Sequence, residues 1–143
     1  MPKVEELLEK KREYTGFDYI NDEECLAVVK QQASSLAYVE NQTDKICLAA
    51  ILSDPNALQY IRNQTEKICI TAVTRNANTL RYVVDQTEDI CLGAVGKDGR
   101  SLRYIRNKTP EICAAAIHQN MNAIMYVPDD MIPETAKLLE RYK

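Results

Sequence analysis

The cysteines are the residues of this chain best suited to chemistry, because a thiolate can bind a metal, exchange disulfides or act as a nucleophile. They recur every 22 residues, at Cys25, Cys47, Cys69, Cys91 and Cys113. Zinc sites use close pairs of cysteines, such as two separated by two residues. Equivalent residues on stacked helices lie about 9–10 Å apart, whereas a disulfide spans at most ~7 Å between Cα atoms. We therefore predict packing thiols, with no metal site and no cofactor.

The other residue types that carry out catalysis show no suitable arrangement. His118 is the only histidine, and no Cys–His or Ser–His–Asp arrangement can be assembled around it. There is no glycine-rich phosphate loop, and no pair of acids stands out from the charged background. We predict that the protein is not an enzyme.

Tyrosines recur with the same 22-residue spacing, at Tyr38, Tyr60, Tyr82, Tyr104 and Tyr126. We predict that each ring packs between layers of the fold, with its hydroxyl group near the surface. A platform on which nucleic-acid bases stack is the alternative.

Arginines form the candidate partner-binding cluster, because a guanidinium group can bind a carboxylate or phosphate with two parallel hydrogen bonds. Its members are Arg62, Arg81, Arg100, Arg103 and Arg106, with Arg75 and Lys97 nearby. Acidic residues gather at the starts of the expected helices, at Asp22, Glu23, Glu24, Asp44, Glu66, Glu88, Asp89 and Glu111. The hypothesis is that the arginines form a stripe on the surface that binds a partner. The alternative is that both charged faces are only solvated and suit the helix dipoles.

The elements that position these residues are tandem repeats. Leucine shares the 22-residue spacing at Leu36, Leu58, Leu80 and Leu102, with Ile124 continuing the series, and threonine shares it at Thr43, Thr65, Thr87 and Thr109. Self-similarity at 20 to 50 residues is typical of stacked-repeat proteins. The copies are Asn41–Arg62, Asn63–Val84, Asp85–Arg106 and Asn107–Pro128, after a weaker first copy, Tyr19–Glu40, in which Asn21 replaces the threonine.

Each repeat predicts two short helices. The threonines suit an N-cap, where a hydroxyl accepts from an orphan backbone N–H. A break follows at Asp54, Asn76, Asp98 and Asn120, and a second, shorter helix then carries Leu58, Tyr60, Ile61 and their equivalents. Pairs of side-chain amides at the corners, such as Asn41–Gln42 and Asn63–Gln64, are expected to satisfy backbone groups between repeats. Helices shorter than ~12–15 residues are marginal alone, so neighbouring repeats must hold them.

Amphipathic segments at both ends predict caps. Val4, Leu7 and Leu8 give one apolar face to the first segment, and Ala136, Leu138 and Leu139 give one to the segment Pro133–Tyr142. The predicted fold is all-α: a right-handed α-solenoid of stacked two-helix repeats with N- and C-terminal capping helices. It forms a single domain, with the N-terminal cap at 1–20, five repeats at 21–130 and the C-terminal capping helix at 131–143.

Composition favours an ordinary globular chain of 143 residues, with 45% hydrophobic and 27% charged residues. The net charge of −3 argues against general attraction to nucleic acids or membrane surfaces. The longest apolar run, Ile46–Leu52, is too short to cross a bilayer, and the charged segment Met1–Tyr14 does not resemble a signal peptide. We therefore expect no membrane partner and a cytoplasmic location.

The repeats resemble a family of short tandem helical repeats, of unknown function, found in proteins of giant viruses, phages and some bacteria. The segment NQTEKICITAVTRNANTLRYVV, Asn63–Val84, carries this resemblance best, and the resemblance covers about residues 21 to 130. It implies an interaction scaffold and is compatible with a viral origin, in which case the location would be the host cytoplasm. It implies no activity, cofactor or catalytic residue.

The function that we favour from the sequence is a protein–protein interaction module, which for a viral or phage protein could mask a host protein surface. Its partner would be another protein that presents acidic groups to the arginines. One alternative is nucleic-acid binding through the same arginines, which the net charge disfavours. Another is a self-assembling structural protein, for example a homodimer.

Overall fold

The computed structural model describes residues 3–13 and 21–143, and every regular element in these residues is helical. The prediction of an all-α protein is confirmed. Tyr19, the first residue of the weakest expected repeat, lies outside the described residues. The chain divides into two compact units, which we call the N-terminal unit, Met1–Asn63, and the C-terminal unit, Gln64–Lys143. Each is described by itself.

The N-terminal unit holds one terminal helix and two repeats. Its elements are α1 (Val4–Glu13), α2 (Asp22–Gln31), η1 (Ala33–Tyr38), α3 (Asp44–Ser53) and η2 (Pro55–Tyr60), where η denotes a 3₁₀-helix. The α-helix α2 packs against α3, and η1 packs against both α3 and η2. Long helices therefore stack on long ones, and short helices on short ones.

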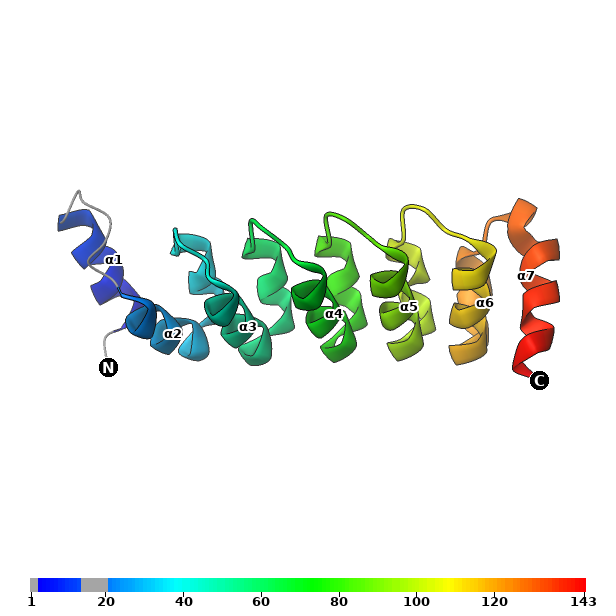
Figure 1. The fold of residues 1–143 in the computed structure, drawn as a ribbon, viewed down its shortest axis with the longest axis horizontal. Coiled ribbons are helices and arrows are strands. Elements are labelled where there is room, and N and C mark those ends of the chain that lie inside the picture. Colours follow the sequence, from blue (N-terminus) through cyan, green and yellow to red (C-terminus); the bar gives the residue numbers. More distant parts are fainter. Residues whose placement is uncertain (1–2, 14–20) are drawn as a thin grey trace. The chain divides into compact units, whose positions relative to one another are not determined.

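The C-terminal unit holds three repeats and a final helix. Its elements are α4 (Glu66–Arg75), η3 (Ala77–Tyr82), α5 (Glu88–Lys97), η4 (Gly99–Tyr104), α6 (Pro110–Gln119), η5 (Met121–Tyr126), η6 (Asp129–Met131), α7 (Ile132–Leu139) and η7 (Glu140–Tyr142). Helices α4, α5, α6 and α7 stand side by side in chain order, and η3, η4 and η5 form a second row (Figure 1).

The second helix of each repeat is confirmed as short, and it is a 3₁₀-helix of six residues. Runs of 3₁₀-helix longer than three or four residues are uncommon because their hydrogen bonds are poorly aligned. Ile61 was expected within this helix but follows it in extended backbone, where its side chain is buried. Burial therefore continues one residue past the end of the short helix.

The predicted threonine caps are confirmed. The hydroxyl groups of Thr43, Thr65, Thr87 and Thr109 accept from the backbone N–H three residues later, at 3.2–3.4 Å. Asn21 performs the same task in the first repeat, since its Oδ1 accepts from the N–H of Glu24 at 2.9 Å. The departure from threonine therefore preserves the helix start.

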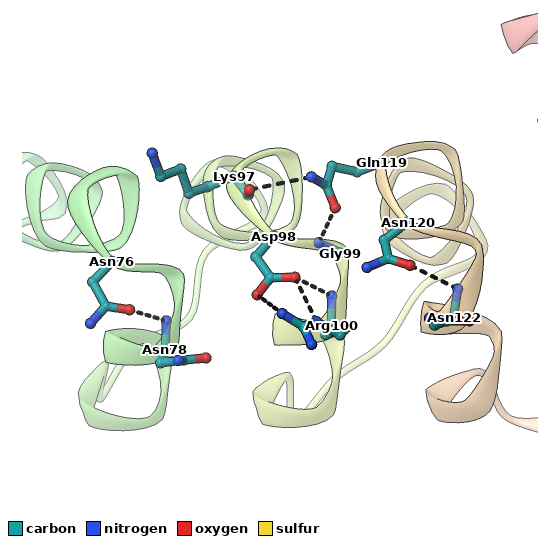
Figure 2. A network of polar contacts seen from close by, with 9 residues as sticks. All are labelled: Asn76, Asn78, Lys97, Asp98, Gly99, Arg100, Gln119, Asn120 and Asn122. Carbon is teal, nitrogen blue, oxygen red and sulfur yellow. Dashed lines mark hydrogen bonds and ion pairs between the residues drawn. The ribbon is translucent and has the colours of Figure 1, made fainter.

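One extended residue ends each long helix and begins each short one. Its backbone N–H closes the last turn of the long helix, as from Asp98 to the Ala94 carbonyl at 3.0 Å. Its side chain caps the short helix in four of the five repeats, whereas Gln32 makes no such contact with η1. Figure 2 shows the contact from Asn76 to Asn78, from Asp98 to Arg100 and from Asn120 to Asn122. This sharp turn favours a short polar side chain, whose oxygen accepts a hydrogen bond from the backbone N–H two residues ahead.

The core consists of the columns that the sequence predicted. The leucine column is fully buried at Leu36, Leu58, Leu80 and Leu102, and the cysteine column is buried at Cys47, Cys69, Cys91 and Cys113. Columns of alanine and isoleucine beside them are also buried, for example Ala50 with Ala72 and Ile46 with Ile68. Small cysteine and alanine side chains allow the long helices to approach closely.

Glutamine side chains connect successive repeats, which confirms the role expected of the amide pairs. Gln86 donates to the carbonyls of Leu80 at 3.2 Å and Tyr104 at 2.9 Å, and it accepts from the N–H of Arg106 at 3.0 Å. Gln42 makes the three equivalent hydrogen bonds in the N-terminal unit. A single residue thus binds three backbone groups from two successive repeats, although the Leu80 carbonyl also accepts from the N–H of Val83 at 3.1 Å.

The C-terminal helix packs against α6, as a cap should. Its buried residue is Thr135, whereas Ala136, expected on the apolar face, is exposed. Leu138 and Leu139 are half-buried. The apolar face of α7 is thus rotated from the expected one. At the other end of the chain, Leu7 of α1 is buried as expected.

Glycine substitutions test the spacing of the layers. A Cβ atom on Gly99 would collide with the backbone carbonyl of Ala116 and lie 3.2 Å from the nitrogen of Asn120, whereas one on Gly96 would meet no atom within 4 Å. We expect Gly99→Ala to lower the free energy of unfolding by about 1–3 kcal/mol, because backbone must move. Gly96→Ala, inside α5, should raise it by about 0.5–1 kcal/mol. Urea denaturation measures the free energy of unfolding of both variants. Equal effects of the two substitutions would contradict the close approach of Gly99 to the Ala116 carbonyl.

Candidate binding surface

Arg81 and Arg103 occupy the same position in the adjacent helices η3 and η4, and both are exposed. The guanidinium carbon of Arg81 lies 4.7 Å from the centre of the Tyr82 ring, and that of Arg103 lies 4.7 Å from the centre of the Tyr104 ring. Such cation–π contacts restrain the arginine side chains. They leave the N–H groups at the edge of the Arg81 guanidinium plane able to bind a planar acceptor, whereas the guanidinium group of Arg103 also makes hydrogen bonds with the side chains of Tyr104 and Tyr126.

Neither of these two arginines forms an ion pair within 4.0 Å with a carboxylate in the described part of the chain. Acidic residues of the C-terminal unit lie at the starts of its long helices, as expected, with Glu66, Glu88 and Asp89 in first turns. Glu66 accepts there from the hydroxyl group of Thr87 at 2.7 Å. The cationic pair and the acids therefore belong to different elements of this unit.

Arg62 and Arg106 have another role. The Nη2 atom of Arg106 donates to the carbonyls of Val83 at 2.9 Å and Val84 at 2.6 Å. In the N-terminal unit, Arg62 makes the same contacts with the carbonyls of Val39 and Glu40, both at 2.6 Å. Each arginine thus satisfies backbone carbonyls of the preceding repeat, which the sequence did not indicate.

Arg100 pairs with Asp98. Its Nε lies 3.3 Å from Oδ1 and its Nη2 lies 3.4 Å from Oδ2, and both residues are drawn in Figure 2. Partial burial acts to raise the pKa of Asp98, but hydrogen bonds from the Arg100 backbone and side chain outweigh it, so the pKa lies below its ordinary value. The guanidinium group of Arg100 is therefore already bound to an acid, unlike those of Arg81 and Arg103.

The chain matches no family model, no curated protein and no solved structure. The surface chemistry of the chain itself must therefore support any function.

The cysteines occupy similar surroundings. Cys47, Cys69, Cys91 and Cys113 are free thiols and are buried, as predicted, while Cys25 is half-buried. The sulfur atoms of Cys47 and Cys91 lie 3.9 and 4.0 Å from the carbonyl oxygens of Gln42 and Gln86. Among the described residues, no three His, Cys, Asp or Glu side chains are placed to hold a metal ion.

His118 lies in an exposed position at the end of α6. Its ring stacks on that of Tyr142, with 4.3 Å between ring centres and 23° between planes. The contact joins η7 to the last repeat, so the histidine supports the C-terminal cap.

An apolar surface on η5 was missed by the sequence analysis. Met121, Ile124 and Met125 are all exposed there. Ile124 is 47% exposed, although the equivalent Leu102 is 0% exposed. The sequence carried a signal for this exposure, because residues 129–143 depart from the 22-residue pattern and do not continue the leucine column.

No helix in residues 3–13 and 21–143 is long and apolar enough to cross a membrane.

The buried thiols predict a pH dependence of stability. Burial raises the pKa values of Cys47, Cys69, Cys91 and Cys113 above 9.0, to about 11 for Cys69. Unfolded thiols ionise near pH 9.0 while the folded ones stay protonated, so the free energy of unfolding should fall as pH rises from about 9 to about 11. Urea denaturation across this range should show a shallower decline for Cys69→Ala than for the wild type. An unchanged slope would contradict the effect of burial.

Proposed function

We propose that this chain is a protein-binding module, and that Arg81 and Arg103 bind acidic groups of its partner. The observation that carries the proposal is the repeated Arg–Tyr stack on η3 and η4. Arginine and tyrosine are enriched among the residues that dominate binding energy at protein interfaces. A restrained guanidinium group also loses less side-chain entropy when it binds.

Two such groups on successive repeats can recognise a pair of carboxylates. Stacked helices are spaced by about 8–10 Å, which is close to one turn of a polyproline II segment, in which three residues at about 3.1 Å each return to the same face. A partner segment with acids at positions i and i+3 would therefore suit Arg81 and Arg103. Because no internal carboxylate of the described chain pairs with either arginine, such a segment would not have to displace one.

The proposal includes the architecture that presents these residues, a single right-handed α-solenoid over residues 1–143. Its support is the continuity of the columns, because threonine, cysteine, leucine and tyrosine keep their 22-residue spacing on both sides of Asn63. The caps and glutamine contacts within each unit also follow one pattern. The resemblance to viral and phage repeats favours a scaffold of this kind, and a cytoplasmic location belongs to the same proposal.

Charge reversal tests the arginine pair. We expect Arg81→Glu/Arg103→Glu to weaken partner binding by about tenfold or more, equivalent to about 1.4 kcal/mol. Capture from cell lysate with quantitative mass spectrometry identifies the partner, and titration calorimetry with that partner measures the loss. Arg81→Lys/Arg103→Lys should lose part of the affinity, because lysine keeps the charge without the planar pair of donors.

The matched control is Lys67→Glu/Arg141→Glu, which makes the same change in net charge at exposed positions on α4 and η7. It should leave binding unchanged. Undiminished affinity in the arginine double variant would remove this surface from consideration. Nucleic-acid binding that falls steeply with rising salt, and is lost in the same variant, would instead support the nucleic-acid alternative.

The exposed surface of η5 favours a second candidate function, self-association. Met121, Ile124 and Met125 present apolar side chains on one short helix, and Met125 is 79% exposed. The described residues of α7 pack mainly against α6. Apolar side chains at the last layer of a repeat array are available to a second copy.

Replacement of this surface tests self-association. Met121→Ala/Met125→Arg introduces the residues that η3 carries at the same positions, Ala77 and Arg81, so the fold should tolerate it. We expect the wild type to gain mass in sedimentation velocity between about 1 and 500 µM, a range typical of weak association, and the variant to stay monomeric. A wild type that is monomeric throughout would exclude this function.

A further inference from the structure

A shallow apolar groove runs between α2 and α3 of the N-terminal unit. Its volume is about 530 Å³, within the range typical of ligand sites. Leu26, Leu48, Ala49 and Leu52 form its apolar lining. This groove is separate from the Arg81–Arg103 surface, which belongs to the C-terminal unit.

Lysines lie at the two ends of the groove. The hydroxyl group of Ser53, at the end of α3, donates to the carbonyl of Lys30, at the end of α2, at 3.0 Å. These two helices are therefore parallel. Lys45 lies in the first turn of α3, eight residues before Ser53, which corresponds to about 12 Å of helix. The apolar lining is thus bounded by one cation at each end.

The exposed leucine of this groove differs from its equivalents in other repeats. Leu52 is 54% exposed, and its position holds Lys30, Thr74, Gly96 and His118 elsewhere. The position of Lys45 holds Glu23, Asp89 and Glu111 in α2, α5 and α6, and another lysine, Lys67, in α4. An acid there is favoured by the helix dipole and a lysine is opposed by it. The exposed leucine is therefore particular to this repeat, whereas the lysine is shared with α4.

We propose that this groove binds a short amphipathic α-helix of a partner protein, with apolar residues on one face and acidic residues at both ends. Each lining helix is ten residues long, about 15 Å, which matches two to three turns of a bound helix. Apolar anchors at i, i+3, i+4 and i+7 fit an open groove of this kind. Acids at both ends complement Lys30 and Lys45 together, whereas a fatty acid supplies only one carboxylate.

A designed peptide tests the groove. The probe is a fluorescent helical peptide of about 14 residues with leucines on one face and glutamates at both ends, titrated against the full chain by fluorescence anisotropy. A matched peptide carries lysines at both ends. We expect saturable binding of the glutamate peptide, at least about tenfold tighter than that of the lysine peptide. Equal affinities, or no binding of either peptide, would overturn the proposal.

Variants locate the binding site. Leu52→Thr and Lys45→Glu take residues from the same positions of other repeats, so both should fold, which circular dichroism checks. Each substitution should weaken binding of the glutamate peptide by about fivefold or more. Lys67→Glu makes the same charge change at the equivalent position of α4 and should have no effect. If Lys67→Glu weakened peptide binding as much as Lys45→Glu does, the assignment of the binding site to this groove would be overturned.

Two other occupants are distinguished in the same experiment. Saturable binding of laurate that is lost in Leu52→Thr, without binding of the glutamate peptide, would identify a site for a single-headed amphiphile and overturn the helix proposal. Self-association of the wild type that is lost in Leu52→Thr would identify a second copy as the occupant and also overturn it.

Discussion

Each helix of this protein depends on its neighbours, because ten-residue α-helices and six-residue 3₁₀-helices cannot hold their conformation alone in water. Two kinds of contact supply what they lack. The leucine and cysteine columns remove apolar surface from water at every layer. Side-chain amides such as Gln86 bind the backbone groups at the ends of two successive short helices. The 22-residue spacing keeps both contacts aligned, so the sequence period is a packing constraint.

Departures from the period follow the same logic. Lys108 occupies the position of Gln86 in the last repeat and cannot accept a hydrogen bond. The residue that would donate to it is Pro128, which has no N–H. Lys108 therefore needs only its donor role, and its Nζ binds the carbonyl of Ile105 at 3.0 Å. The two changes compensate, which explains how a lysine replaces the glutamine without leaving a backbone donor unpaired at this corner.

Much of the helical structure could be predicted from local chemistry. Thr43 and its equivalents give the start of each long helix, and Asp98 and its equivalents give the end, because caps act within three residues of their own position. The 3₁₀ geometry of Gly99–Tyr104 could not be predicted in this way, since it arises where a short helix packs against both rows of the next repeat. The orientation of α7 also depends on packing, and Thr135 rather than Ala136 is buried there.

The arginines show most clearly why a site is harder to predict than a fold. In the sequence, Arg62, Arg81, Arg100, Arg103 and Arg106 are alike. Their roles differ because a guanidinium group binds whichever acceptor is nearest: backbone carbonyls for Arg106, a carboxylate for Arg100 and only an aromatic ring face for Arg81. The carbonyls that Arg106 binds are set by the rise and rotation between repeats, which spacing alone does not give, whereas Asp98 and Tyr82 are near neighbours of Arg100 and Arg81 in the sequence.

The surface residues of a repeat protein therefore fall into two groups: those that form hydrogen bonds with its own backbone, and those that do not. Arg106 belongs to the first group, because its loss would leave the carbonyls of Val83 and Val84 without this donor. Arg81 belongs to the second, since the same position in another repeat holds a residue of different charge and size, Gln59. Substitution there changes the partner surface without removing a contact that the stack requires. Binding can consequently evolve in the N-terminal and C-terminal units independently, one exposed column at a time.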